Sequence, residues 1–362
     1  MKRLSMKFRR WLKGITLLAI LAIVGCSDDR SKAPENDVEG EVVAPTDARS
    51  QSIVVYAASS NAQIGPVLEA YTAETGVKIN LVVDDLENLV ARIERSGSGS
   101  VADLLIATNV GDLWNATEKD IYRPVYSASV TDQIPENLRD AEKLWHALSV
   151  RARIAVYNTD LVEAAQVATI SDYGSLGDES WRGKLCLSSS SVPGNRSLIA
   201  YLIKKHGARN AELIVRGWQA NLAATVFTDD DEVMQAVEDG RCAIGIVDSN
   251  DLAMFSRGRP NAPVAAQWFA EGSPVYIDVT GAGVTRHAEN PDGATRLLEW
   301  LTSEQPDALF AALGLEFPAN PAAPVDASIE KWSKYVAQPM NVSEFGYFHD
   351  DASKLAERAH YP

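Results

Sequence analysis

Four short polar segments supply most of the side chains in this 362-residue chain that can bind a solute. Each follows an apolar run and is rich in Ser, Asn or Asp, which offer hydroxyl, amide and carboxylate groups with little bulk. The segments are residues 57–61, 107–110, 188–197 and 248–251. The same residue types cap helices, so ligand contact and helix capping both explain any single segment.

The candidate ligand contacts in these segments are Ser59, Ser60, Asn61, Thr108, Ser189, Ser190, Asn195, Asp248, Asn250 and Asp251. Two further candidates lie in β-rich runs. Arg151 either binds a carboxylate or phosphate group bidentately or forms a salt bridge in a hinge. Tyr276 either lines a ligand-binding cleft formed by these polar segments or packs in the core.

Residues typical of an enzyme do not accompany these segments. The sequence has no Gly-x-Ser-x-Gly elbow, no phosphate-binding loop with Lys-Ser/Thr and no dinucleotide fingerprint. Its five histidines, at positions 146, 206, 287, 349 and 360, lack the spacing of metal ligands. Acids at 229–232 fit a helix N-terminus, where capping and the dipole favour them. We therefore expect a binding protein with no catalytic residue and no catalytic cofactor.

The first 51 residues predict export and lipid anchoring. Six bases and no acids in residues 1–25 flank an apolar run at 15–24 (ITLLAILAIV), which is too short to span a bilayer and is typical of a signal peptide. The run closes as Ile-Val-Gly-Cys, which resembles a bacterial lipobox and predicts a signal peptide at 1–25 and acylation of Cys26. Residues 26–51 lack aromatic residues and predict a disordered tether. The expected location is the periplasmic or outer face of a membrane.

The net charge of −15, from 34 Lys and Arg against 49 Asp and Glu, restricts the partners. Binding to nucleic acid depends on clustered basic residues, which an acidic chain of this kind does not supply. The same negative charge argues against attraction to anionic lipid through surface charge. We therefore expect no nucleic-acid partner, and contact with the membrane only through the lipid on Cys26.

Alternating strands and helices are expected to position the polar segments. Apolar runs and helical spacing predict, in order, a strand at 53–56, a helix around 64–71 ended by Gly76, a strand at 78–83, a helix at 86–95 and a strand at 103–106. A second unit has strands at 184–187 and 243–247, with a helix between the acids at 229–232 and Gly240. This order predicts parallel sheets covered by helices, with ligands beyond the carboxyl ends of the strands.

Two longer β-rich runs, at 149–158 (SVRARIAVYN) and 275–284, are expected to cross between domains. Cys186 and Cys242 lie in or beside predicted strands of the second unit. Export places them in an oxidising compartment, where they either form a disulfide or remain buried free thiols.

Several segments, taken in order, carry a family resemblance. They are residues 53–56 with the Ser-rich turn that follows, 149–158, 181–191 (WRGKLCLSSSS) with Asn195 and 197–198, 236–247, 279–284 (VTGAGV) and 340–343 (MNVS). Together they resemble the bacterial periplasmic ferric-iron-binding proteins, the transferrin-like branch of ABC-importer binding proteins. The resemblance covers nearly all of residues 52–362.

The resemblance implies a two-lobed α/β fold of the type II periplasmic binding proteins, in which each lobe is a mostly parallel sheet flanked by helices and crossing strands join the lobes. It places lobe 1 at 52–149 and about 277–320, and lobe 2 at 150–276 and about 321–362. It implies a monomer that captures Fe(III), chelated iron or a small anionic solute between the lobes and delivers it to an ABC permease with its ATPase. A solute-sensing lipoprotein not coupled to transport is the alternative.

Those relatives hold Fe(III) mainly with tyrosinates, and this sequence departs from that pattern. The position of their Tyr-Tyr pair reads Asn250-Asp251, and a loop tyrosine of some relatives falls at Gly194. A histidine of the first loop falls near Ser60, and a glutamate falls at Thr108. The possible metal ligands are Asp248 and Asp251, while Arg151, Ser189, Ser190 and Asn195 are candidates for an anion.

Overall fold

The computed structural model describes residues 52–269, 273–335 and 337–362, in which nine strands form one hydrogen-bonded sheet. The strands are β1 Ser52–Ala57, β2 Lys78–Val83, β3 Leu104–Ala107, β4 His146–Asn158, β5 Leu185–Cys186, β6 Ile244–Asp248, β7 Val264–Gln267, β8 Ile277–Val284 and β9 Phe317–Pro318. Their order is β2-β1-β3-β8-β4-β6-β5, and β7 and β9 also pair with β4. The predicted signal peptide, Cys26 and the tether lie outside the described residues.

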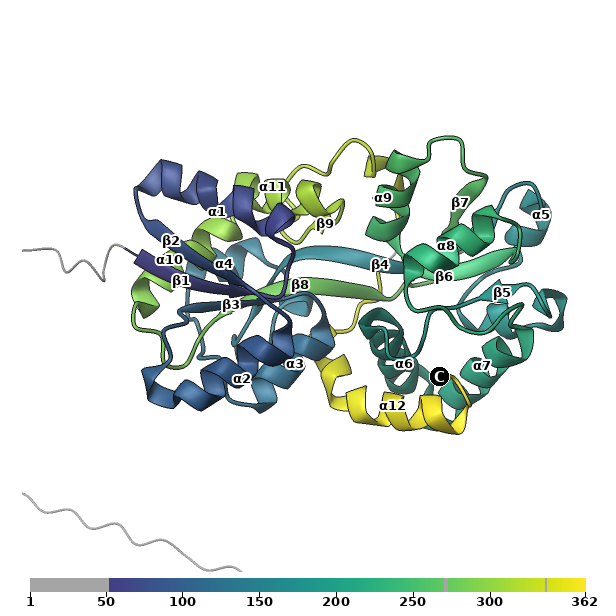
Figure 1. Cartoon of the computed structure of the whole chain (residues 1–362), viewed down its shortest axis with the longest axis horizontal. Coiled ribbons are helices and arrows are strands. Elements are labelled where there is room, and N and C mark those ends of the chain that lie inside the picture. Colours follow the sequence, from purple (N-terminus) through teal and green to yellow (C-terminus); the bar gives the residue numbers. More distant parts are fainter. Residues whose placement is uncertain (1–51, 270–272, 336) are drawn as a thin grey trace, which may run out of the picture. The chain divides into compact units, whose positions relative to one another are not determined.

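Strand β4 joins the two halves of the sheet. Its residues from His146 to Ala152 pair antiparallel with β8, and those from Arg153 to Tyr157 pair antiparallel with β6. In the first half, β1 is parallel to both β2 and β3, and in the second half β5 is parallel to β6. Figure 1 shows β4 and β8 side by side between the two groups of helices. The predicted strand at 149–158 is part of β4, and the predicted parallel pairing is confirmed for β1, β2 and β3 and for β5 and β6. The pairs that involve β4 or β8 are antiparallel, so the sheet is mixed rather than parallel throughout.

Helices cover both faces of the first half-sheet. They are α1 Asn61–Thr75, α2 Leu86–Ser96, α3 Val110–Glu118, α4 Ala128–Gln133, α10 Pro291–Leu301 and α11 Glu304–Gly314. Helix α1 shows why they form, because Ile64, Val67, Leu68 and Tyr71 recur at helical spacing and are all buried. Gly76 ends this helix with a positive φ of 73°, a conformation that glycine adopts without steric cost.

The second half-sheet carries α5 Ala164–Val167, α6 Pro193–His206, α7 Ala208–Asn221, α8 Asp230–Glu238 and α9 Ser249–Gly258. The last helix, α12 His349–Arg358, follows the 3₁₀ segment Val342–Phe348 and packs on α6 and α7 (Figure 1). Other 3₁₀ turns are Gly97–Gly99, Glu136–Leu138, Gly174–Gly177, Glu179–Trp181 and Glu330–Trp332.

Two predicted polar loops are in part the first turns of helices. Helix α6 begins at Pro193 rather than near residue 198, because proline fits the first helical position and its missing N–H is not needed there. Helix α9 begins at Ser249, directly after the extended residue Asp248. The prediction of loops through 197 and 251 is therefore wrong, and Asn195, Asn250 and Asp251 lie at helix N-termini.

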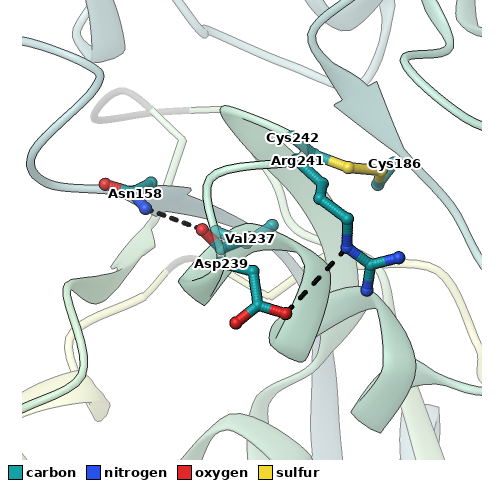
Figure 2. Close-up of a disulfide and its surroundings, with 6 residues drawn as sticks. All are labelled: Asn158, Cys186, Val237, Asp239, Arg241 and Cys242. Atoms are coloured by element: carbon teal, nitrogen blue, oxygen red, sulfur yellow. Dashed lines mark hydrogen bonds and ion pairs between the residues drawn. A yellow bond between two sulfur atoms is a disulfide. The ribbon is translucent and has the colours of Figure 1, made fainter.

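Cys186 and Cys242 form a disulfide (Figure 2). Their Cα atoms are 5.8 Å apart. The bond joins β5 to the residue that precedes Ala243 and β6, and β5 and β6 are parallel neighbours in the sheet. Beside the disulfide, Asn158 Nδ2 donates to the carbonyl oxygen of Val237 at 2.7 Å, which fixes the end of β4 to helix α8. Of the two alternatives for these cysteines, the structure contains the disulfide.

Candidate functional site

The polar ends of β3 and β6 are brought together by the side chain of Arg151 on β4. Its Nε donates to Asp248 Oδ2 at 3.2 Å, at the end of β6. Its Nη2 donates to the carbonyl oxygen of Thr108, directly after β3. Asp278 on β8 and Glu316 before β9 lie 3.7 and 3.8 Å from the guanidinium. Arg151 therefore connects the first half of the sheet to the second.

This environment favours the hinge salt bridge over an anion-binding role for Arg151. The residue is only 8% exposed, and three carboxyl groups and one carbonyl already surround the guanidinium. Burial raises the pKa of Asp278 and of Glu316, and the charge of Arg151 opposes that rise. An anionic solute would have to compete with these resident carboxylates.

A second arginine, Arg153, lies two residues along the same strand. Its Nη1 and Nη2 bind the two carboxylate oxygens of Asp230, the Nη2 contact being 3.0 Å, and Nη1 lies 3.2 Å from Asp248 Oδ1. Nη2 also donates to Asn195 Oδ1 at 2.6 Å. Sequence reasoning missed both Arg153 and Asp230. The available signal was the Arg-x-Arg spacing, which places two side chains on one face of a strand.

Asp230 is fully occupied by these contacts. Beyond the two bonds from Arg153, it accepts from Ser188 Oγ at 2.7 Å and from the backbone N–H of Asp248 at 3.0 Å. A carboxylate has about four lone-pair directions, so none remains for a ligand. The predicted capping of helix α8 is confirmed at Asp229, whose side chain accepts from the Glu232 N–H, but capping does not explain the neighbouring Asp230.

Three carboxylates meet at this point. Asp230, Asp248 and Asp251 each offer an oxygen, and these oxygens lie within 4.8 Å of one another. Burial, together with the charges of Asp248 and Asp230, raises the pKa of Asp251 well above its usual range. Asn250 Nδ2 donates to Asp251 at 3.2 Å, while its buried Oδ1 has no hydrogen-bond partner in the described part of the chain. Asp251 and the outer lone pairs of Asp248 therefore keep acceptor capacity that the protein does not use, and Asn250 Oδ1 is a buried acceptor without a partner among the described residues.

The candidates before and inside α1 have local roles. Ser60 caps α1 by accepting from the Gln63 N–H, and the buried Ser59 donates to Gln63 Oε1 at 3.0 Å. Asn61 is the exposed first residue of the helix. Within the described residues, no side-chain hydrogen bond joins these three to the carboxylates, so the capping alternative accounts for Ser60.

The Ser-rich segment after β5 is also engaged by the protein itself. Ser189 Oγ and the Ser190 N–H donate to the backbone oxygen of Pro362 at 3.0 and 2.7 Å. Asn195 Nδ2 donates to Ser188 and to the Ser189 carbonyl at 2.8–3.0 Å, while its Oδ1 accepts from Arg153. The buried side chain of Asn195 thus holds Arg153 in place through its oxygen, and its Nδ2 donor is used by Ser188 and Ser189 rather than being free for an anion.

Neither Tyr276 nor position 194 supplies a phenolate to the carboxylates in this structure. Tyr276 is fully buried and packs against Tyr201 and Phe345 with ring centroids 5.5 Å away, which is the core alternative. A Cβ atom at Gly194 would lie 3.3 Å from both Arg153 Nη1 and Asp248 Oδ2. A side chain at position 194 would therefore press against the arginine–aspartate pair, which would have to shift by a few tenths of an ångström.

Two half-sheets joined at β4, with polar strand ends that meet at Arg151, are the arrangement expected of a type II solute-binding protein. In agreement, residues 67–337 match the model of the family described as bacterial extracellular solute-binding protein. The chain belongs to this family.

The chain is similar to named iron-uptake proteins. It is 31% identical over 290 residues to iron uptake protein A2 of Synechocystis sp., covering 77% of this chain and 82% of the relative. It is 28% identical over 324 residues to iron uptake protein A1 of the same organism, covering 88% and 89%. The solved Trichodesmium FutA (IdiA) complex with iron and citrate ligands has a TM-score of 0.81 and 31% identity, covering 86% of this chain and all of that one (100%). These matches confirm the predicted family resemblance and the type II fold.

Proposed function

We propose that this chain is the substrate-binding component of an ABC iron importer and that it captures Fe(III) as a complex with a small oxygen-donor chelator. The names of its relatives support iron as the cargo. The iron and citrate in the Trichodesmium protein support a chelated form. The loaded protein would then deliver the complex to the permease and its ATPase.

The observation that carries the proposal is the small number of free donors at the three carboxylates. Fe(III) is a hard cation that requires several anionic oxygen ligands. Asp230 is saturated and Asp248 is shared by Arg151 and Arg153, which leaves Asp251 and part of Asp248. An iron ion that arrives with its own chelator needs only one or two protein ligands.

We also propose that the lobes divide as the sequence predicts and close about β4 and β8. The position of Arg151 between Thr108 and Asp248 supports a cleft whose floor lies at this strand. Lipid attachment at Cys26 is part of the same proposal. It is tested by metabolic labelling with a fatty acid, which should be lost in Cys26→Ser and retained in the wild type.

The cargo is tested with the full chain purified from producing cells. Native mass spectrometry after addition of Fe(III)–citrate should show one iron and at least one citrate per chain, and citrate alone should give no adduct. Asp251→Asn should weaken binding of the complex roughly tenfold, because it replaces a carboxylate that can bind the metal by a neutral amide. Asp231→Asn, an exposed acid in the first turn of α8, is the matched control and should leave the affinity unchanged.

Two results contradict this proposal. A copurifying solute without metal, bound at Asp251, would show that iron is not the cargo. A complex with iron but without chelator, formed at the same position, would show that the protein itself completes the coordination shell.

A further inference from the structure

The guanidinium group of Arg153 occupies the position at which a metal ion would bridge Asp230 and Asp248. Its Nη1 binds Asp230 Oδ2 and lies 3.2 Å from Asp248 Oδ1, and both carboxylates belong to the group that converges within 4.8 Å. Arg153 is 1% exposed, and its Nε has no hydrogen-bond partner among the described residues. A buried positive charge therefore already lies between two of the three carboxylates in the one acidic cluster with metal-ligand geometry found in the described part of the chain.

The surrounding residues hold this charge in place. Asn195 accepts from Nη2 at 2.6 Å, and Tyr173 Oη donates to the backbone oxygen of Arg153 at 2.6 Å. Position 194 is glycine, and any Cβ there would lie 3.3 Å from Nη1. The arginine therefore has a packed site of its own, which an incoming ion cannot clear by moving an exposed side chain.

We propose that Arg153 is a specificity-determining residue that acts as a built-in cation and excludes free metal ions from Asp230, Asp248 and Asp251. The inference rests on the proposed function and deepens it, because a cleft closed to bare ions takes iron only in a complex that brings its own donors. Removing the guanidinium should expose three carboxylates, the donor set that hard cations prefer.

The physical basis is charge repulsion in a buried place. A trivalent ion that shares carboxylates with a guanidinium lies a few ångströms from a like charge, where low dielectric makes repulsion strong. The bonds to Asp230 already use its acceptor capacity, so the ion gains few ligands in return. Both effects oppose a bare ion. Replacing the arginine by a neutral side chain removes the repulsion and frees the two acceptor positions on Asp230 that Arg153 uses, while the bonds from Ser188 and the Asp248 N–H remain.

The test uses aqueous Tb(III) as a hard trivalent probe, with luminescence excited through the protein's aromatic residues. We expect the full wild-type chain to show no Tb(III) binding that depends on Asp251. Arg153→Met should gain one Tb(III) site at the carboxylates. Its affinity should be roughly 100-fold higher than that of the same position in the wild type, a change of about 3 kcal/mol in binding free energy. Arg153→Lys keeps the charge and is the matched control without gain. The double variant Arg153→Met/Asp251→Asn should lose the gained site. This result would distinguish binding at the three carboxylates from weak Tb(III) binding to other acidic surface residues.

Arg153→Met leaves the buried Asp230 without a counter-charge and can fail to fold for that reason. The double variant Arg153→Met/Asp230→Asn removes both charges together, retains Asp248 and Asp251, and should show the same gain in weaker form. Tb(III) binding by the wild type that Asp251→Asn abolishes would overturn the inference, as would a folded double variant without gain. Failure of wild-type protein to bind Fe(III)–citrate would instead contradict the proposed function and leave the Tb(III) result standing.

Discussion

Replacing Arg151 by methionine is expected to destabilise the protein by about 3–5 kcal/mol at pH 7, the usual cost of removing one partner from a buried ion pair. The substitution leaves Asp248, Asp278 and Glu316 without the guanidinium that lies 3.2–3.8 Å from them. The arginine side chain is 9% exposed, so solvent screening is weak. Methionine fills the volume of the aliphatic stem, and the loss is therefore mainly one of charge.

The penalty should depend on pH with a defined sign. Burial already raises the pKa of Asp278 and of Glu316 above their usual values, and loss of Arg151 removes the charge that opposes this rise. In the variant, these groups bind protons in the folded state that the unfolded chain releases near neutral pH. The variant should therefore lose stability as pH rises, and the gap to wild type should be smaller at pH 5 than at pH 7.

The assay is urea unfolding followed by circular dichroism and tryptophan fluorescence at both pH values. Arg182→Met is the matched control, because Arg182 and Glu179 form a surface pair at 3.4 Å with side chains 68% and 85% exposed. It should cost less than about 1 kcal/mol at either pH. An Arg151→Met variant that loses less than about 1 kcal/mol, or whose loss is the same at both pH values, would refute this account of the buried network.

Three further predictions follow from the disulfide, from one buried acid and from the site. Replacing Cys186 and Cys242 by serine should lower the free energy of unfolding by roughly 4 kcal/mol, as their separation of 56 residues implies, and wild type with dithiothreitol should unfold at the same urea midpoint. Burial raises the pKa of Asp307 from 3.8 to about 8, so stability should fall as pH rises through that window. Asp307→Asn should flatten this dependence and stabilise the protein by up to about 4 kcal/mol at pH 7, as measured in the same assay. Fe(III)–citrate bound near Asp248 and Asp251 should show no intense visible tyrosinate band in absorption spectra, and an intense band would place a phenolate on the iron.

The local elements were predictable because short-range patterns determine them. The apolar spacing of Ile64, Val67, Leu68 and Tyr71 predicts one buried helix face, and α1 has that face buried between a Ser60 cap and Gly76. The β-rich run at 149–158 predicts a long strand, and β4 extends it to His146. The sequence predicts the starts of α6 and α9 several residues too far along the chain, because Ser, Asn and Gly are also frequent in loops.

The site could be predicted only as a set of candidates. Asp248 and Asp251 follow a predicted strand, and their position at a strand end is a consequence of sequence order. Sequence spacing does not reveal that Asp230 reaches Arg153, 77 residues away along the chain. Because helix capping explains acids at 229–232 equally well, the sequence did not point to the buried ion pair between Asp230 and Arg153.

By itself, the sequence determined the alternation of strands and helices, the family resemblance and the absence of tyrosine at the expected ligand positions. The tertiary structure decided that Arg151 links Thr108 to Asp248 and that Arg153 fills the space beside Gly194. The physical reason is sheet register, which pairs Arg153 with Asp248 and Arg151 with Asp278. The strand register determines which charged residues, far apart in the sequence, come into contact in the buried part of the sheet. Those contacts determine whether a carboxylate can bind a ligand or is already bound by the protein.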